Sequence, residues 1–509
     1  MKSCTLPVCP ERSSIRHPAC SVLHTAALIA LLLFAGYAAA GVDTETNSRD
    51  AVDLDETARH ARFGEDLMIR SFLPGLAASD DPADQQILAN IRWTFLGQAD
   101  FDDPNEELAP DFPGYGTDAV LLAGNELQNV AHPDGVAMDV GPLKWVAVNL
   151  ETGFEYLIEL PPDALRRVNA AAQIAGLGQG YRGSAPEGVH AEHGNNESSM
   201  NGESSPGAGS LDFGANFDLD SGSGEEPGAD GWGGGSDSRR RVFNNTTYPY
   251  RTMGQLNGGR RSGCSGTLVG PQHVLTAAHC LWSKRRNAWS NVTFRPAREG
   301  SCESLACEPY GNENRSDVAG GFSGWWYFTP WQYRQDGSQW KYDYGIMLVR
   351  GRPGNRTGWM GYVALGQSAT RDYCDKTPFG PGYLGGTCMN RGYPACGFSE
   401  NSNSGAFGPE SCSQGWAYQS NDVCEIGKFH SKGPDGWNSI FTTNCDTGRG
   451  HSGSAIYTRN YNGNGNVVLG VVSASDCRTC PERNGYPNRI RRVTPDVIRW
   501  INYFRTTQP

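Results

Sequence analysis

Cysteine is missing from a long stretch of this chain: none of the 15 cysteines lies between residues 21 and 263. No disulfide can form within that stretch. Three cysteines lie near the N-terminus (Cys4, Cys9 and Cys20), and the other twelve lie between Cys264 and Cys480. Twelve is an even number, and its concentration in one region is typical of a domain whose disulfides form in an oxidising compartment.

The chain also lacks a complete zinc-binding pattern. Cys477 and Cys480 have the CxxC spacing of half a zinc site, but neither a second CxxC nor a pair of histidines accompanies them. We therefore favour disulfide formation over metal binding, and we expect no metal and no other cofactor.

Basic residues are scarce in the first half of the chain. Residues 41–237 contain 36 Asp and Glu against 9 Lys and Arg, a charge of −27, whereas residues 238–509 contain 18 against 31, a charge of +13. The acidic half either attracts the basic half or keeps it soluble, or the two surfaces are solvated independently. We expect the acidic half to be a partner of the basic half, and we expect no nucleic-acid partner.

Only one long apolar run is present, from Ala26 to Ala40 (AALIALLLFAGYAAA). It is shorter than the ~20 residues that span a bilayer. Basic residues (Lys2, Arg12 and Arg16) precede it, and Ala38-Ala39-Ala40 has the small side chains of a cleavage site. We therefore expect a signal peptide over residues 1–40, a secreted protein, and no membrane attachment after cleavage.

Composition divides the rest of the chain into three parts. Residues 41–181 are predicted to be an acidic N-terminal pro-region, with apolar stretches at 145–148 and 156–158 and a short helix over 165–174. Residues 182–237 are rich in Gly, Ser and acidic residues, cannot bury enough apolar surface to fold, and are predicted to be a linker. Residues 238–509 are predicted to form the main domain.

The main domain has the pattern of an all-β fold. Short β-rich runs alternate with Gly, Asn and Pro turns, which is typical of a barrel or sandwich. The last segment differs, because Thr494 and Pro495 are a helix start and apolar residues then recur at helical spacing up to Ile501. The predicted strands cover residues 266–269, 273–276, 345–349, 453–457 and 467–473.

Three motifs in chain order supply a base, a carboxylate and a nucleophile. They are Thr276-Ala-Ala-His279-Cys280, Tyr342-Asp343-Tyr-Gly345 and Gly450-His-Ser452-Gly-Ser454. A serine hydroxyl is a poor nucleophile near neutral pH, so it needs an imidazole to take its proton and a carboxylate to hold that imidazole in the useful tautomer. The motifs therefore predict nucleophilic catalysis by Ser452, with His279 as base and Asp343 as its orienting partner.

The segment Cys264–Cys280 (CSGTLVGPQHVLTAAHC), together with the order His, Asp, Ser, resembles the chymotrypsin-like serine proteases. The Asp-Tyr-Gly and Ser-Gly-Ser motifs are most similar to the branch that contains bacterial glutamyl endopeptidases. The resemblance implies two six-stranded β-barrels with a C-terminal helix and a Cys264–Cys280 disulfide. It also implies an oxyanion hole made by the N–H groups of Gly450 and Ser452. The implied activity is that of a monomeric, secreted serine endopeptidase, made as a precursor, that cleaves proteins or peptides through an acyl-enzyme.

The residues expected around the specificity pocket are Asp446, Thr447, Val472 and Ser475. Asp446 suggests a preference for Arg or Lys, but the glutamyl branch has Asp-Thr at the same spacing without that preference. Glutamate-cleaving relatives have a histidine where Val472 stands, so the preferred side chain stays open. Trypsin-type enzymes have an aspartate where His451 stands, so we expect another route of activation.

Two further patterns have alternative interpretations. Arg239-Arg240-Arg241 resembles a processing site, although a cut further upstream fits equally well, and we place it somewhere in residues 228–241. The four tryptophans between Phe322 and Trp340 belong either to an aromatic loop that grips substrate or to ordinary packing. Sequons suit a secreted glycoprotein and start at Asn244, Asn245, Asn291, Asn314 and Asn355.

The sequence leaves two alternatives to the protease function open. The first is a non-catalytic extracellular binding protein built on a protease fold. The second is an esterase, because acyl-enzyme chemistry is common to both reactions. The presence of all three residues His279, Asp343 and Ser452 favours the protease.

Overall fold

The structure is a computed structural model of the chain, and it describes twelve segments. These are residues 80–101, 143–161, 180–181, 239–257, 263–335, 340–374, 388–396, 412–420, 424–433, 435–458, 466–475 and 488–507. The chain divides into units Met1–Leu54 and Asp55–Pro509, and all described residues belong to the second. The expected signal peptide, the linker over 182–237 and the helix over 165–174 lie outside them.

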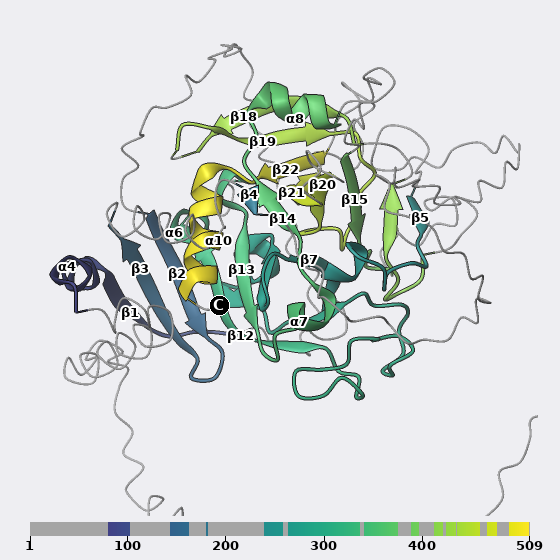
Figure 1. Ribbon diagram of the computed structural model, residues 1–509, viewed down its shortest axis with the longest axis horizontal. Coiled ribbons are helices and arrows are strands. Elements are labelled where there is room, and N and C mark those ends of the chain that lie inside the picture. The colour runs from purple at the N-terminus through teal and green to yellow at the C-terminus, as the bar shows by residue number, and fades with distance from the viewer. Residues whose placement is uncertain are drawn as a thin grey trace, which may run out of the picture. The chain divides into compact units, whose positions relative to one another are not determined.

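The first sheet of the main domain closes into a six-stranded barrel (Figure 1). Its strands run in the order β12-β11-β6-β7-β8-β13, and β13 pairs back onto β12. Apolar side chains alternate into its interior because successive residues of a strand point to opposite faces. The strands are β6 (Met253–Asn257), β7 (Cys264–Leu268), β8 (His273–Thr276), β11 (Thr293–Pro296), β12 (Phe322–Pro330) and β13 (Gly345–Val349).

The second sheet is open over the described residues and forms a half-barrel. Its path is β18-β19-β22-β21-β20-β15-β17-β5, and β14 (Gly361–Val363) pairs with both β21 and β4 (Gly180–Tyr181). Its members are β5 (Arg239–Arg241), β15 (Cys388–Gly392), β17 (Tyr418–Ser420), β18 (Ile426–Lys432), β19 (Asn438–Thr443), β20 (Ala455–Thr458), β21 (Val467–Ser475) and β22 (Asn488–Arg492).

The all-β class expected from the sequence is thus confirmed, and so is the C-terminal helix α10 (Pro495–Thr507). Thr494 begins that helix, since its carbonyl accepts the N–H of Ile498 at 3.0 Å. The other helices are α4 (Pro82–Asn90), α6 (Trp331–Gln335), α7 (Gly354–Thr357), α8 (Gln367–Cys374) and the 3-10 turns η1 (Tyr250–Thr252), η2 (Ala278–Cys280) and η3 (Trp340–Tyr342). A small hairpin joins β9 (Trp282–Ser283) to β10 (Ala288–Trp289). None of the described helices is long and apolar enough to cross a membrane.

Three strands from the N-terminal region extend the first sheet. They are β1 (Arg92–Gln98), β2 (Leu143–Asn149) and β3 (Phe154–Leu160), and β2 pairs antiparallel with β12. In Figure 1 these blue strands lie beside β12 and α10. The predicted pro-region and the main domain therefore share one continuous sheet.

The tryptophan-rich stretch is part of the barrel. Phe322–Pro330 forms strand β12, which pairs with both β11 and β13. Trp326 is fully buried, and Trp325 is half-buried against the same core. Ordinary packing, rather than a substrate-gripping loop, accounts for these two side chains.

Five disulfides join ten of the twelve C-terminal cysteines. The pairs are Cys264–Cys280, Cys302–Cys307, Cys374–Cys388, Cys396–Cys412 and Cys424–Cys445. The first is the bridge that the resemblance implies. Cys477 and Cys480 lie outside the described residues.

Candidate active site

His279 lies in a tight turn at the end of β8. That strand ends at Thr276, and η2 then carries His279 with its side chain nearly buried. The disulfide from Cys264 on β7 to Cys280 fastens this turn to the barrel. The imidazole is therefore held by a strand on one side and a covalent bridge on the other.

Asp343 contacts His279 through both of its carboxylate oxygens. Its Oδ1 accepts the backbone N–H of His279 at 3.0 Å, and its Oδ2 lies 2.9 Å from His279 Nδ1. Ser473 on β21 donates its hydroxyl to the same Oδ2 at 2.5 Å. Asp343 is completely buried, and these donors stabilise its negative charge away from water. A carboxylate opposite Nδ1 favours the tautomer with its proton there, which leaves Nε2 as the basic nitrogen.

Ser452 lies in a loop that packs directly against the histidine turn. Its carbonyl oxygen accepts the N–H of Ser265 at 2.8 Å and lies 3.6 Å from Cys280 Sγ. The approach is so close that a Cβ on Gly453 would lie 2.0 Å from Thr276 Oγ1 and 2.9 Å from Ala277 N. The fold thus brings residues 173 positions apart in the chain, His279 and Ser452, to one place.

Gly450 is required by the shape of this loop. Its φ of +94° is one that side chains disfavour, and a Cβ there would lie 2.3 Å from the carbonyl oxygen of Tyr393. Ser265 Oγ donates to the carbonyl of Gly450 at 2.7 Å and fixes its peptide plane. Within the described part of the chain, the backbone N–H groups of Gly450 and Ser452 donate no hydrogen bond. Two such groups in one loop are suited to bind a developing oxyanion.

His451 has a structural setting that the sequence did not reveal. Its Nδ1 lies 3.0 Å from Asn390 Oδ1, and the Asn390 amide donates to Ser454 Oγ at 2.8 Å and to the carbonyl of Ala455 at 3.0 Å. Burial, and then the charge of Arg239, hold the pKa of His451 well below its usual range. Because Asn390 Oδ1 can only accept, the neutral His451 ring donates from Nδ1. Asn390 therefore contacts the chain on both sides of Ser452.

Among the described residues, the other two histidines outside the catalytic motifs, His273 and His430, are also held neutral. Burial and then the charge of Arg505 lower the pKa of His273 to about 3. Burial, followed by the charges of Arg489 and Lys428, lowers the pKa of His430 to about 4. These settings agree with a structural role for both.

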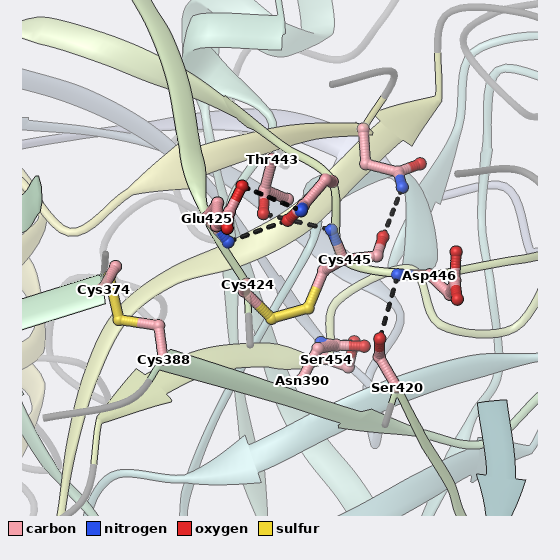
Figure 2. Close-up of a disulfide and its surroundings, with 12 residues drawn as sticks. Cys374, Cys388, Asn390, Ser420, Cys424, Glu425, Thr443, Cys445, Asp446 and Ser454 are labelled. Atoms are coloured by element: carbon pink, nitrogen blue, oxygen red, sulfur yellow. Dashed lines mark hydrogen bonds between the residues drawn. A yellow bond between two sulfur atoms is a disulfide. The ribbon is translucent and has the colours of Figure 1, made fainter. Parts of the chain in front are cut away.

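Three of the residues expected around the specificity pocket are buried. Asp446 and Thr447 are nearly buried, and Asp446 donates its backbone N–H to Ser420 Oγ at 3.3 Å, next to the Cys424–Cys445 disulfide (Figure 2). Val472 packs with Ile490, and its backbone pairs with the residues that follow Ser452: its carbonyl accepts the Gly453 N–H at 2.8 Å and its N–H donates to the Ser454 carbonyl at 2.9 Å. Their part in a specificity pocket stays a prediction. Nothing is described for the side chain of Ser475.

Tyr344, the residue after Asp343, belongs to a buried cluster of charged side chains. Tyr344 donates its hydroxyl to Asp496 Oδ2 at 3.1 Å, and Arg491 lies 3.3 Å from the same oxygen. The carboxyl of Asp435 accepts the N–H of Asp496 at 3.2 Å. Burial, and then the charge of Asp496, raise the pKa of Asp435 to about 7.

Comparison with known proteins gives one family model, described as Trypsin, which matches residues 238–318. An extracellular metalloprotease of Bacillus subtilis is 35% identical over 158 residues, which are 28% of this chain and 45% of that protein. A glutamyl endopeptidase of Bacillus licheniformis is 33% identical over 129 residues, 25% of this chain and 35% of that protein. The chain therefore spans less than half the length of these relatives.

A solved Glu endopeptidase, in complex with MPD, superposes with a TM-score of 0.35 and 22% identity, covering 53% of this chain and 97% of that one. The inactive serine protease 35 of Mus musculus is 48% identical, but over only 50 residues, which are 9% of this chain and 11% of that protein. The relatives thus include proteins named as proteases and one named as inactive.

One relative is named a metalloprotease, which raises the question of a metal site in the described part of this chain. The one grouping among them with metal-ligating side chains is Cys264, His279 and Cys280. The two cysteines are joined in a disulfide, and a metal prefers the free thiolate. This grouping does not fit a metal ion.

Proposed function

Because the C-terminal half of the chain resembles the chymotrypsin-like serine proteases, we propose that it is a serine endopeptidase that acts through His279, Asp343 and Ser452. The observation that carries the proposal is the double contact between Asp343 and His279. A carboxylate that accepts both the backbone N–H and Nδ1 of one histidine fixes the position of the ring as well as its tautomer.

The proposed reaction begins with Ser452. His279 Nε2 takes the hydroxyl proton while Ser452 Oγ forms a bond to the scissile carbonyl carbon. The carbonyl oxygen becomes an oxyanion that the N–H groups of Gly450 and Ser452 stabilise. The imidazolium then gives its proton to the leaving amine as the C–N bond breaks. Water attacks the acyl-enzyme by the same route and releases the second product and free Ser452.

We propose that the protein is secreted and made as a precursor, as the N-terminal apolar run and the disulfides suggest. The contacts of strand β5 support a cut upstream of it. Arg239–Arg241 form strand β5 against β17, Arg239 is buried, and the N–H of Val242 donates to the carbonyl of Ala417 at 3.0 Å. A protease needs exposed backbone free of such bonds. We therefore propose a cut upstream of Arg239, within residues 228–238.

Substitution of the nucleophile tests the activity. Secreted protein with Ser452→Ala should lose casein hydrolysis, whereas a matched control with Ser301→Ala, an exposed serine of the same domain, should keep it. Equal residual activity of wild type and Ser452→Ala would refute the proposal. N-terminal sequencing of the same wild-type sample locates the cut.

The second candidate is a non-catalytic binding protein. The similarity to a protein named inactive serine protease 35 favours it. The complete set of His279, Asp343 and Ser452 opposes it. An inactive wild type that folds normally would favour this candidate.

A further inference from the structure

Strand β12 presents an edge that the barrel itself does not use. One edge pairs with β13 over Gly324–Phe328, and the other pairs with β11 only at Phe322 and Ser323. From Trp326 to Pro330 that second edge pairs with β2, residues Asn149 to Trp145. Without β2 it would expose unpaired N–H and C=O groups, a condition that proteins avoid by covering the edge.

We propose that residues 80–101 and 143–161, together called the segment, are a permanent structural part of the protease domain and stay bound after the chain is cut within the linker. This inference rests on the proposed precursor function only in assuming that the linker is cut. Backbone hydrogen bonds and buried aromatic rings, rather than attraction between the opposite net charges of the two halves, hold the segment in place.

The centre of the contact is Trp145. Its side chain is almost completely buried, and its ring centroid lies 4.3 Å from that of Trp500 and 5.8 Å from that of Phe504, both on helix α10. It also lies 5.5 Å from the ring of Tyr344, which follows Asp343. Removal of β2 would therefore expose the inner face of the C-terminal helix to water, which is unfavourable for apolar surface.

The segment has a further contact with the main domain at Asp100 and Phe101. The N–H of Trp289 donates to the carbonyl of Asp100 at 2.8 Å, and Phe101 forms a β-bridge with Trp289. The pairing of β2 with β12 is thus not the segment's sole contact among the described residues.

Two charged contacts also join the segment to the main domain, one mostly buried and one exposed. Glu155 accepts from Trp289 Nε1 at 2.6 Å and pairs with Arg334, and the Glu151–Arg350 pair is exposed. Salt screens exposed pairs and leaves buried apolar contacts intact. High salt should therefore not release the segment.

The test uses the full chain with Ser452→Ala, so that self-cleavage cannot interfere and activity is not the readout. A recognition sequence for a site-specific protease is inserted within residues 200–215, and the cut protein is passed over a size-exclusion column in 0.1 M and in 1 M NaCl. The two fragments should elute together at both salt concentrations. Separation at either concentration would overturn the proposal, whether or not the protein is a protease.

Three variants of this cleavable chain identify the contacts. Trp145→Ala should cause loss of the N-terminal fragment after cutting, whereas Leu96→Ala, on the same segment but 40% exposed, should not. The double variant Glu151→Gln and Glu155→Gln should keep its fragment. Loss of the fragment from the double variant alone would show that charge holds it and would contradict the proposal. If Trp145→Ala does not fold, the unsubstituted cleavable chain and the double variant still show whether the N-terminal fragment stays bound after the cut.

Discussion

Asp343 contacts His279 at two points: its Oδ1 accepts the backbone N–H at 3.0 Å, and its Oδ2 lies 2.9 Å from the ring nitrogen Nδ1. Replacement of Asp343 by Asn keeps the shape but places an NH2 group against one of these two donors. The imidazole then adopts the wrong tautomer, with its proton on Nε2. We expect Asp343→Asn to lower kcat by about 10⁴-fold with a smaller effect on KM. Steady-state kinetics measure this, and an active Asn variant would show that Asp343 does not orient the base.

Asn390 is expected to be a positioning residue for the nucleophile loop. Asn390→Ala removes the acceptor for His451 and the donor for Ser454 and Ala455. Small displacements at a reacting centre cost up to about 10²-fold in rate. We expect kcat to fall by roughly that factor while KM changes little. A buried His451 left without its acceptor should also lower the free energy of unfolding by about 1–3 kcal/mol. A stability loss with unchanged kcat would assign Asn390 a purely structural role.

Gly450 and Gly366 provide a matched pair of substitutions. A Cβ on Gly450 would collide with the backbone at Tyr393 and Ala395, whereas a Cβ on Gly366 meets nothing within 4 Å. Gly450→Ala should turn the peptide that supplies the oxyanion donor and lower kcat by about 10²–10³-fold. Gly366→Ala should have wild-type kinetics. Equal kinetics for both variants would rule out the oxyanion role of this peptide.

The carboxyl pair Asp435 and Asp496 predicts a pH dependence of stability. The pKa of Asp435 is raised from its ordinary value of 3.8 to about 7 in the folded protein. Between about pH 4 and pH 7 the folded chain therefore keeps a proton that the unfolded chain has lost, so this residue's contribution to stability falls as pH rises. Above about pH 7 the contribution becomes constant.

The variant Asp435→Asn isolates this contribution. The amide cannot ionise: its Oδ1 can accept the Trp437 N–H and its NH2 group can donate to the Asp496 carboxylate, although that group no longer accepts the Asp496 N–H. The lost hydrogen bond lowers stability by the same amount at every pH and leaves the slope unchanged. Buried His273 and His430, with lowered pKa values, contribute the opposite slope, and their contribution cancels between the two proteins. Denaturant unfolding from pH 4 to pH 8 should show the variant gaining stability relative to wild type up to about pH 7. A constant difference across that range would refute the raised pKa.

Local sequence patterns predicted those parts of the structure that depend on neighbouring residues. The run from His273 to Thr276 became β8, the five strands expected in the main domain all correspond to observed strands, and Thr494 begins α10. The Cys264–Cys280 bridge followed from the resemblance. These features require only spacing, turn chemistry and a short motif.

Features that depend on distant residues could not be predicted. Asn390 lies 61 residues before His451, and β2 precedes β12 by more than 170 residues, so no local pattern announces either contact. Charge composition suggested docking by attraction, but the described contact between Trp145 and Trp500 is apolar. Val472 was expected near a pocket, and only the fold shows that its backbone pairs with Gly453 and Ser454, directly after Ser452.

The most direct test of the proposed function is covalent labelling of the secreted protein with phenylmethylsulfonyl fluoride, followed by peptide mass mapping. Sulfonylation requires a serine activated by a neighbouring base. We expect one label per chain, on Ser452, and its loss when His279 is replaced by Ala. A folded wild-type protein that takes up no label, or one that is labelled equally after Ser452→Ala, would contradict a serine protease mechanism at this site.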